Sequence, residues 1–176
     1  MSTQFLRNYI DIINEAGKAD AGSFEWGTTI TKAYLPMEHN EEFTNPLTLM
    51  DWLRQFVPAH VTDADEPFIR GFLGKMLFSG DEILKKTTVL SGGEKVRCML
   101  SKMMLQNPNV LILDEPTNHL DISSKDILLK ALQEFRGTVL FVSHDRDFIN
   151  NLATHIIELT ADGARWYHGN YDSYLY

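Results

Sequence analysis

The sequence predicts an α/β fold in which helices cover both faces of a parallel sheet. Two observations predict it: short apolar runs in the second half of the chain, and stretches of helical periodicity that separate them. The runs are residues 110–113, 138–142 and 155–159, and the helical stretches cover about 123–135 and 145–152. Strands buried on both faces read as continuous apolar runs, whereas half-exposed strands alternate apolar and polar residues. We therefore expect these runs to lie in one parallel sheet.

The first 35 residues predict a helix followed by a hairpin. Residues 3–16 place apolar side chains on one broad helical face, and Gly17 can end this helix. Residues 23–35 alternate loosely between apolar and polar types around Gly27, which is typical of a hairpin.

The next stretch, about 45–107, is predicted to be mostly helical. Asn45-Pro46 opens one helix, Pro58 stops it, and Pro67 can start another. Ser79 to Glu82 repeats a helix-capping pattern before two apolar residues.

Composition places the chain among ordinary globular domains. It has 176 residues, of which 44% are apolar and 23% charged, which is enough for one domain with a core. The lone cysteine, Cys98, excludes an internal disulfide and favours the cytoplasm. The chain shows no signal-peptide pattern, and no apolar stretch approaches the roughly 18 residues that span a bilayer. A net charge of −8 disfavours a surface that binds nucleic acid through non-specific electrostatic attraction to the phosphates.

Three clusters of residues in the sequence could bind a ligand or take part in a reaction. The first cluster is the start of a helix. Ser91 and Glu94 form an S-x-x-E capping box, and Gly92 and Gly93 leave the backbone open to close approach. The N–H groups and the dipole of such a helix end favour a phosphate. An ordinary capped helix with two flexible residues explains the same pattern.

The second cluster is the apolar run that ends in Asp114 and Glu115. Ligands of open α/β sheets bind at the carboxyl ends of the strands. An Asp in this place can hold Mg²⁺, with waters completing the shell, and the adjacent Glu can polarise an attacking water. A solvated acidic turn after a strand is the alternative.

The third cluster places His144 after the next apolar run, where an imidazole can sense or donate to a phosphate near neutral pH. A surface histidine at a strand end is the alternative. A zinc site formed by His119, Asp121 and His144 is conceivable, but their spacing gives it no support.

In this order, the three clusters resemble the nucleotide-binding domain of an ABC ATPase. Leu90–Glu94 (LSGGE) resembles its signature motif, Val110–Glu115 (VLILDE) its Walker B motif, Asn118–Asp121 its D-loop and His144 its switch histidine. The resemblance implies an α/β P-loop NTPase fold with a parallel-sheet body, a helical signature subdomain and an incomplete N-terminal end. The implied subdomain covers about 45–107, and about 18–44 and 108–176 form the sheet body and C-terminal tail.

The sequence resembles the ABC-F class of these ATPases in particular. Four segments carry this resemblance: Leu90–Arg97 (LSGGEKVR), Asp114–Asp121 (DEPTNHLD), Ser143–Arg146 (SHDR) and the tail Gly169–Leu175 (GNYDSYL). ABC-F proteins are soluble, carry two such domains in one chain and include translation factors that act at the ribosome. The tail resembles the end of the second of these domains.

The resemblance implies a role for each matching residue. Asp114 would bind Mg²⁺ through water, Glu115 would be the general base and His144 would contact the γ-phosphate of ATP. Ser91, Gly92, Gly93 and Glu94 belong to the part that binds nucleotide held on an opposite domain in a head-to-tail sandwich, and Asp121 would work across that interface. The implied chemistry is phosphoryl transfer to water.

The sequence departs from the family pattern in two places. No G-x-x-x-x-G-K-[ST] phosphate loop occurs, and Ser2-Thr3 could be its remnant. Without this loop we expect the ATPase activity only in the complete protein, and neither tight ATP binding nor hydrolysis by this chain alone. Met37 stands where the family has the glutamine of its Q-loop, and Glu38 could replace that glutamine in part. Because a strand would be missing with the phosphate loop, we also expect exposed apolar surface, weak stability and self-association.

Three functions are therefore open. The first is an ABC-F ATPase domain, in a soluble and cytoplasmic protein, that touches ribosomal RNA only through parts outside these residues. The second is a module that lacks its own ATP site and only donates its signature motif to a partner's nucleotide. The third is a metal-dependent hydrolase built on Asp114 and Glu115.

Overall fold

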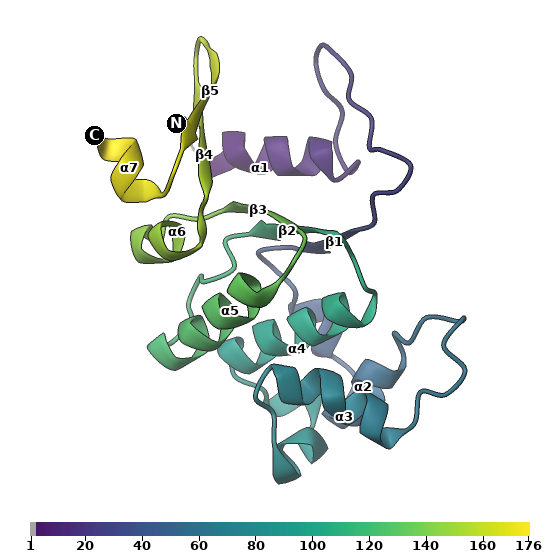
Figure 1. Ribbon diagram of the computed structural model, residues 1–176. Coiled ribbons are helices and arrows are strands. Elements are labelled where there is room, and N and C mark those ends of the chain that lie inside the picture. The colour runs from purple at the N-terminus through teal and green to yellow at the C-terminus, as the bar shows by residue number, and fades with distance from the viewer. Residues whose placement is uncertain (1–2) are drawn as a thin grey trace.

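A small parallel sheet lies between helices in the computed structural model, which describes residues 3–176 (Figure 1). The sheet contains β1 (Lys32–Leu35), β2 (Val110–Asp114) and β3 (Thr138–Val142) in the order β1-β2-β3. Both strand pairs are parallel, with Val110 opposite Lys32 on one side and Thr138 on the other. The predicted parallel sheet is confirmed for the first two apolar runs. The expected remnant at Ser2 lies outside the described residues.

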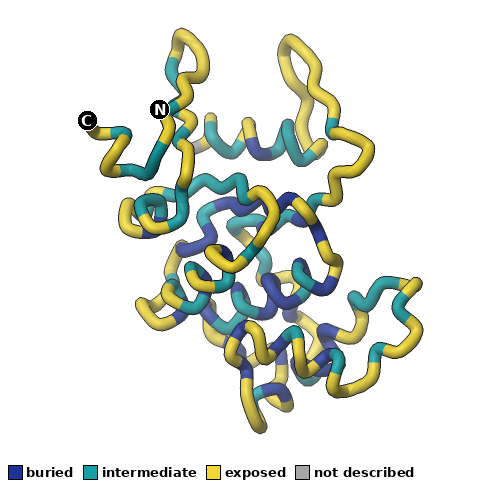
Figure 2. Tube along the Cα trace, viewed as in Figure 1, coloured by how far each residue is buried: buried dark blue, intermediate teal, exposed yellow. Residues whose placement is uncertain are grey.

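The middle strand, β2, is buried along its whole length, as its apolar sequence predicts. Val110 and Ile112 pack with Ile10 of helix α1 (Thr3–Ile13) on one face of the sheet, and Leu111 and Leu113 face the main core. Figure 2 shows this buried centre in dark blue, with the loops around it exposed.

Most of the helices lie on the side of the sheet opposite α1 (Figure 1). The helices are α1 (Thr3–Ile13), α2 (Leu49–Arg54), α3 (Glu66–Lys75), α4 (Gly92–Leu105), α5 (Ile122–Glu134), α6 (Arg146–Leu152) and α7 (Tyr171–Leu175), with short 3-10 helices η1 (Asn40–Phe43), η2 (Gly80–Leu84) and η3 (Thr87–Val89). None of these helices, in the described part of the chain, is long and apolar enough to cross a membrane.

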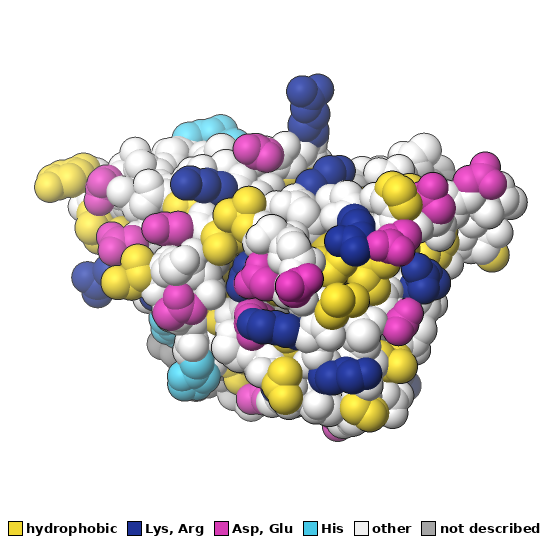
Figure 3. All heavy atoms as spheres, turned by 90° about the horizontal axis from the view of Figure 1, so that it is seen from below, with side chains coloured by type: hydrophobic (Ala, Val, Ile, Leu, Met, Phe, Trp, Pro, Cys, Tyr) yellow, Lys and Arg dark blue, Asp and Glu magenta, His cyan; other side chains and the backbone are white. Residues whose placement is uncertain are grey.

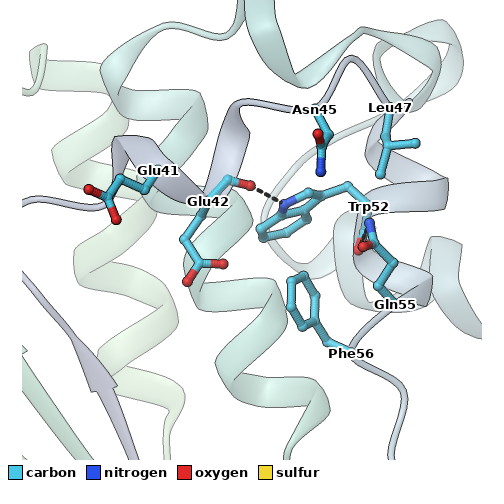
Figure 4. A pocket seen from close by; sticks show the side chains of 7 residues that line it. All are labelled: Glu41, Glu42, Asn45, Leu47, Trp52, Gln55 and Phe56. Carbon is cyan, nitrogen blue, oxygen red and sulfur yellow. Dashed lines mark hydrogen bonds between the residues drawn. The ribbon is translucent and has the colours of Figure 1, made fainter.

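Trp52 anchors the helical segment to the core. Its ring stacks on Phe43 at 5.0 Å between centroids and meets Phe56 edge-on at the same separation. Its indole nitrogen donates a hydrogen bond to the carbonyl oxygen of Glu42 at 2.8 Å, so its one polar atom is satisfied (Figure 4). Lys102 approaches the same cluster from α4, with its ammonium 4.1 Å from the centre of the Phe56 ring.

The structure corrects the prediction for the first 35 residues. The first helix ends at Ile13, because the N–H groups of Ala16 and Gly17 both turn back to the carbonyl oxygen of Asp11. No hairpin forms over residues 23–35, since only β1 is a strand there and it pairs with β2. Tertiary partners override the local alternation here.

The third apolar run also differs from its prediction. Strand β4 (His155–Thr160) pairs antiparallel with β5 (Gly163–His168) in a separate two-stranded sheet. The two-residue connection, Ala161-Asp162, leads into Gly163 at the start of β5, whose φ of +128° suits a glycine. The Asp162-Gly163 pair is a turn signal that predicts a local hairpin partner for β4.

Apolar side chains are exposed at several places on the surface. Trp166, Val89 and Ile122 are 69%, 69% and 80% exposed. Single exposed apolar side chains are ordinary on protein surfaces, so the exposed apolar surface, weak stability and self-association expected from a missing strand remain predictions. Figure 3 shows basic and acidic side chains interspersed on the face seen from below, without a continuous basic patch on that face.

Substitution of Leu111 by Ala should lower the free energy of unfolding by about 2–5 kcal/mol, because Leu111 is fully buried in the central strand. The matched control is Leu84→Ala, at a position that is 56% exposed, which should cost less than about 0.5 kcal/mol. Urea denaturation followed by tryptophan fluorescence measures both. Equal losses would contradict the packing described for β2.

Candidate functional site

The parallel register brings Glu115 and His144 together at one end of the sheet. Asp114 lies opposite Val142 in the sheet, so the residues that follow the two strands emerge side by side. The Nδ1 atom of His144 contacts a carboxylate oxygen of Glu115, and the His144 backbone N–H donates to the other oxygen at 3.3 Å. The prediction that both residues lie at the carboxyl ends of neighbouring strands is confirmed.

Glu115 is held in an unusual backbone conformation. Its φ is +48°, in the left-handed region that non-glycine residues seldom adopt, and its N–H donates to the carbonyl oxygen of Val142 at 2.8 Å. The carboxylate is only 11% exposed, whereas the ring of His144 is 63% exposed. Backbone strain of this kind concentrates at functional sites, where the surrounding structure holds it.

Asp114 is a buried carboxylate in a negative environment. Burial raises its pKa, the guanidinium of Arg7 lowers it, and the charges of Glu115 and Asp11 raise it, so that the net shift is upward. Burial and the same Asp114 carboxylate raise the pKa of Tyr34 to about 12. A cation beside Asp114 stabilises its charged form, as Arg7 does here.

Arg7 is a residue of this cluster that the sequence analysis missed. It lies on α1, its Nε is 3.8 Å from Asp114 Oδ2, and its Nη2 is 3.8 Å from the sulfur of Met37. The Met37 side chain thus contacts the guanidinium next to the strand end. A lone arginine on an amphipathic helix carries no motif, so the sequence alone gives no signal for it. The substitute role expected for Glu38 stays a prediction.

The N-terminus of α4 shows the predicted capping box. Ser91 Oγ accepts a hydrogen bond from the Glu94 N–H at 3.2 Å, and Glu94 accepts one from the Ser91 N–H at 2.8 Å. Lys85 reaches the same carboxylate at 2.6 Å. Burial works against the charge of Glu94, but the bonds from Lys85 and Ser91 outweigh it and lower the pKa of Glu94. The capped-helix interpretation is confirmed, and anion binding there stays a prediction.

The two glycines of the capping box differ in their surroundings. A Cβ on Gly93 would come within 2.0 Å of Ser124 Oγ and 3.2 Å of an Asp121 carboxylate oxygen. A Cβ on Gly92 would lie 4.0 Å from its nearest neighbour, the carbonyl oxygen of His119. The missing side chain at 93 therefore serves the close approach of α4 to α5, whereas at 92 it leaves the backbone accessible.

Asp121 belongs with the capping box and not with the strand ends. Its side chain caps α5 by accepting the Ser124 N–H at 3.3 Å, and the bonds from Ser124 lower its pKa although slight desolvation opposes them. The predicted site residues therefore form two groups: Asp114, Glu115 and His144 at the sheet, and Ser91–Glu94 with Asp121 at two helix starts. The loop 115–121 connects the groups.

The strand-end group fits Mg²⁺ better than a metal held by protein ligands alone. Mg²⁺ is bound by one or two carboxylates together with waters and substrate phosphates. Asp114 offers one such carboxylate, and Arg7 beside it shows that this position attracts positive charge. Within residues 3–176, no group of three or more His, Cys, Asp or Glu side chains is placed to hold a metal. The zinc alternative gains no support, because His144 contacts Glu115 while Asp121 caps α5.

Comparison with known proteins agrees with this arrangement. The family model described as "ABC transporter" matches residues 29–118, about half of the chain. "Uncharacterized ABC transporter ATP-binding protein YkpA" of Bacillus subtilis is 52% identical over 165 residues, which cover 93% of this chain and 30% of that protein. "ABC transporter F family member 5" of Arabidopsis thaliana is 46% identical over 107 residues, 61% of this chain and 16% of that protein. The chain thus spans less than a third of either relative.

A solved structure shows the same fold. It is described as an inward-facing conformation of a putative metal-chelate type ABC transporter, and it matches with a TM-score of 0.71 at 18% identity. The match covers 93% of this chain and 68% of the other.

Substitution of Gly93 by Ala should lower the free energy of unfolding by about 1–3 kcal/mol, because the new methyl group forces α4 and α5 apart. Gly92→Ala is the matched control one residue earlier. It should be neutral or stabilise by up to about 1 kcal/mol, since alanine favours a helix and meets open space. Thermal unfolding followed by circular dichroism measures both, and similar melting temperatures for the two variants would contradict the assigned close approach.

Proposed function

The chain belongs to the ABC transporter family, and on that premise we propose that it is the ATP-hydrolysing domain of an ABC-F type protein. The observation that carries the proposal is the contact of Glu115 with His144 beside Asp114 at the carboxyl edge of the sheet. The ABC-F assignment is supported by the DEPTNHLD segment and by the Arabidopsis relative named above. In this proposal about 45–107 acts as a helical subdomain, and about 18–44 and 108–176 form the rest.

The strand-end residues divide the hydrolytic work. When bound, Mg²⁺ would supply positive charge against the phosphate oxygens. Asp114 would hold the ion through water, and Glu115 accepts the proton of the attacking water. His144 orients the Glu115 carboxylate, and its exposed ring is free to contact the γ-phosphate. Because Glu115 is fixed by its backbone and by His144, it needs little rearrangement before the reaction.

The helix-start group serves a second nucleotide-binding domain. Gly92 leaves the first N–H groups of α4 open to a γ-phosphate that the other domain holds, and Lys85 adds positive charge nearby. Val89 and Ile122 stand next to this group in the sequence and are highly exposed. Burial of these two side chains would favour a head-to-tail pair, with Asp121 at its interface.

The wider role that we propose is cytoplasmic and associated with the ribosome. The net charge of −8 implies that RNA contacts come from other segments of the full-length protein.

Glu115→Gln in the full-length protein should lower ATP turnover at least about 100-fold, because the amide cannot accept a proton. ATP binding should remain, since the carboxylate contributes to the chemical step. Glu134→Gln on the exposed side of α5 is the control and should hydrolyse ATP normally. Phosphate release and retention of radiolabelled ATP are the two readouts. Normal turnover in the Glu115 variant would remove Glu115 from the role of base.

A second candidate function is donation of the signature motif alone. One observation favours it. The hydrogen bonds and the ion pair that hold Ser91, Glu94 and Asp121 in place involve none of the strand-end residues.

Titration with fluorescent ATP·Mg²⁺ separates the two functions. The ATPase proposal predicts saturable binding by the full-length protein at this domain's strand-end site, weakened by Asp114→Asn, and weak binding by the 176 residues alone, because they contain no phosphate loop. Donation predicts that Asp114→Asn leaves binding by the full-length protein unchanged, and that a complete nucleotide-binding domain binds ATP more tightly after mixing with this chain, an increase that Ser91→Arg abolishes. Binding that neither substitution changes would reject both functions for these residues.

A further inference from the structure

Two histidines meet on the hairpin of β4 and β5, outside the candidate site described above. His155 begins β4, His168 ends β5, and the register places the two residues directly opposite each other. Their ring centres lie 4.6 Å apart, and the rings are inclined at 62°. Both residues are exposed, so solvent and solutes reach them. We call these two residues the histidine pair.

The hairpin backbone brings the histidine pair to the closest approach that a two-stranded ladder allows. The Gly169 N–H donates to the carbonyl oxygen of Thr154 at 2.8 Å, so Thr154 and Gly169 face each other as a hydrogen-bonded pair. Hydrogen-bonded and non-hydrogen-bonded pairs alternate along an antiparallel ladder. His155 and His168 therefore form a non-hydrogen-bonded pair, in which opposite side chains lie nearest to each other.

A neighbouring hydroxyl group orients the first of the two rings. The Nδ1 atom of His155 lies 3.0 Å from Thr154 Oγ1, at hydrogen-bonding distance. When the ring donates this bond, Nδ1 carries the proton and Nε2 keeps a lone pair. Histidines that bind metals are commonly held in this way, with the other ring nitrogen bonded to an oxygen. Nε2 of His155 is then the nitrogen available to a ligand.

The spacing of the two rings fits one metal ion bound by both. Because a metal–nitrogen bond is about 2.0 Å long, such an ion would lie about 3.2 Å from each ring centre. Ring centres 4.6 Å apart then subtend about 90° at the ion, the angle between neighbouring ligands of tetragonal Cu²⁺ or Ni²⁺. We propose that the histidine pair binds one divalent transition-metal ion of this class, with water in the remaining positions.

This ion differs in its chemistry from the Mg²⁺ expected at the strand ends. Imidazole nitrogen suits copper, nickel and zinc, whereas Mg²⁺ takes carboxylate and water oxygens. With two protein ligands, the histidine pair also differs from a closed zinc site, which has four. Affinity should follow the general order for divalent ions, with Cu²⁺ bound more tightly than Ni²⁺.

A bound ion would join the two strands at the end of the hairpin that lies opposite the turn. Within the described residues, β4 and β5 pair only with each other. A two-stranded hairpin is marginally stable by itself in water. The open strands do not hold the two rings together, so metal binding stabilises the closed hairpin.

Trp166 offers a local reporter of metal binding. It precedes His168 by two residues on β5, so both side chains lie on one face of the hairpin, and it is 69% exposed. Cu²⁺ and Ni²⁺ quench the fluorescence of a nearby indole. Titration of the full-length protein with CuCl₂ or NiCl₂ should therefore give a saturable quenching that Trp166→Phe removes. MgCl₂ should give none, because Mg²⁺ does not select imidazole.

The variants His155→Gln and His168→Gln should each weaken Cu²⁺ and Ni²⁺ binding at least about tenfold, because one ring then holds the ion in place of two. The matched control is His60→Gln, at an exposed histidine outside the hairpin, which should leave the affinity unchanged. The electron paramagnetic resonance spectrum of bound Cu²⁺ should show one nitrogen ligand fewer in either hairpin variant than in the unmodified protein. Unchanged affinity in both hairpin variants, or an equal loss in the control, would overturn the proposal.

Amide hydrogen exchange tests whether the ion bridges the strands. At a Ni²⁺ concentration 100 times the dissociation constant, exchange of Ile156 and Tyr167 through hairpin opening should slow about 100-fold. The same Ni²⁺ concentration should leave these rates unchanged in His168→Gln, because an ion on one ring does not oppose opening. Unaltered exchange in the metal-saturated, unmodified protein would contradict binding by both rings.

Discussion

Burial of β2 on both faces is the constraint from which the geometry of the candidate site follows. A strand covered on one side by α1 and on the other by α4 and α5 has one register in which all its apolar residues are buried. That register sets Asp114 opposite Val142. This register therefore places Asp114, Glu115 and His144 at the same end of the sheet.

The second group of site residues depends on a different constraint, the close approach of two helix starts. The α4 and α5 termini are each capped by a side chain, and they come together only because residue 93 is a glycine. A sequence pattern that fits phosphate binding is thus explained in part by packing. Gly92 is the position whose open surroundings still require a reason, and access to an anion provides one.

The sequence alone predicts much of this arrangement, because its signals are local. The apolar run of β2, the capping box at Ser91 and the strand-end positions of Glu115 and His144 each follow from short segments read by themselves. What it could not predict depends on contacts between distant residues. The alternation in 23–35 yields to pairing with β2, and Arg7 enters the site only because α1 lies over the sheet. The pairing of β4 with β5 was signalled by Asp162-Gly163 but is incompatible with placing every apolar run in one sheet.

The contact between Glu115 and His144 implies that the two residues act as one unit, and a double-mutant cycle measures this most directly. ATP turnover would be compared in the full-length protein and in its Glu115→Gln, His144→Ala and doubly substituted forms. Because His144 acts partly through the carboxylate, the loss in the double variant should be smaller than the product of the two single losses, and any loss beyond that of Glu115→Gln measures the contact of His144 with the γ-phosphate. Losses that multiply would contradict this account, since they would show two residues working independently.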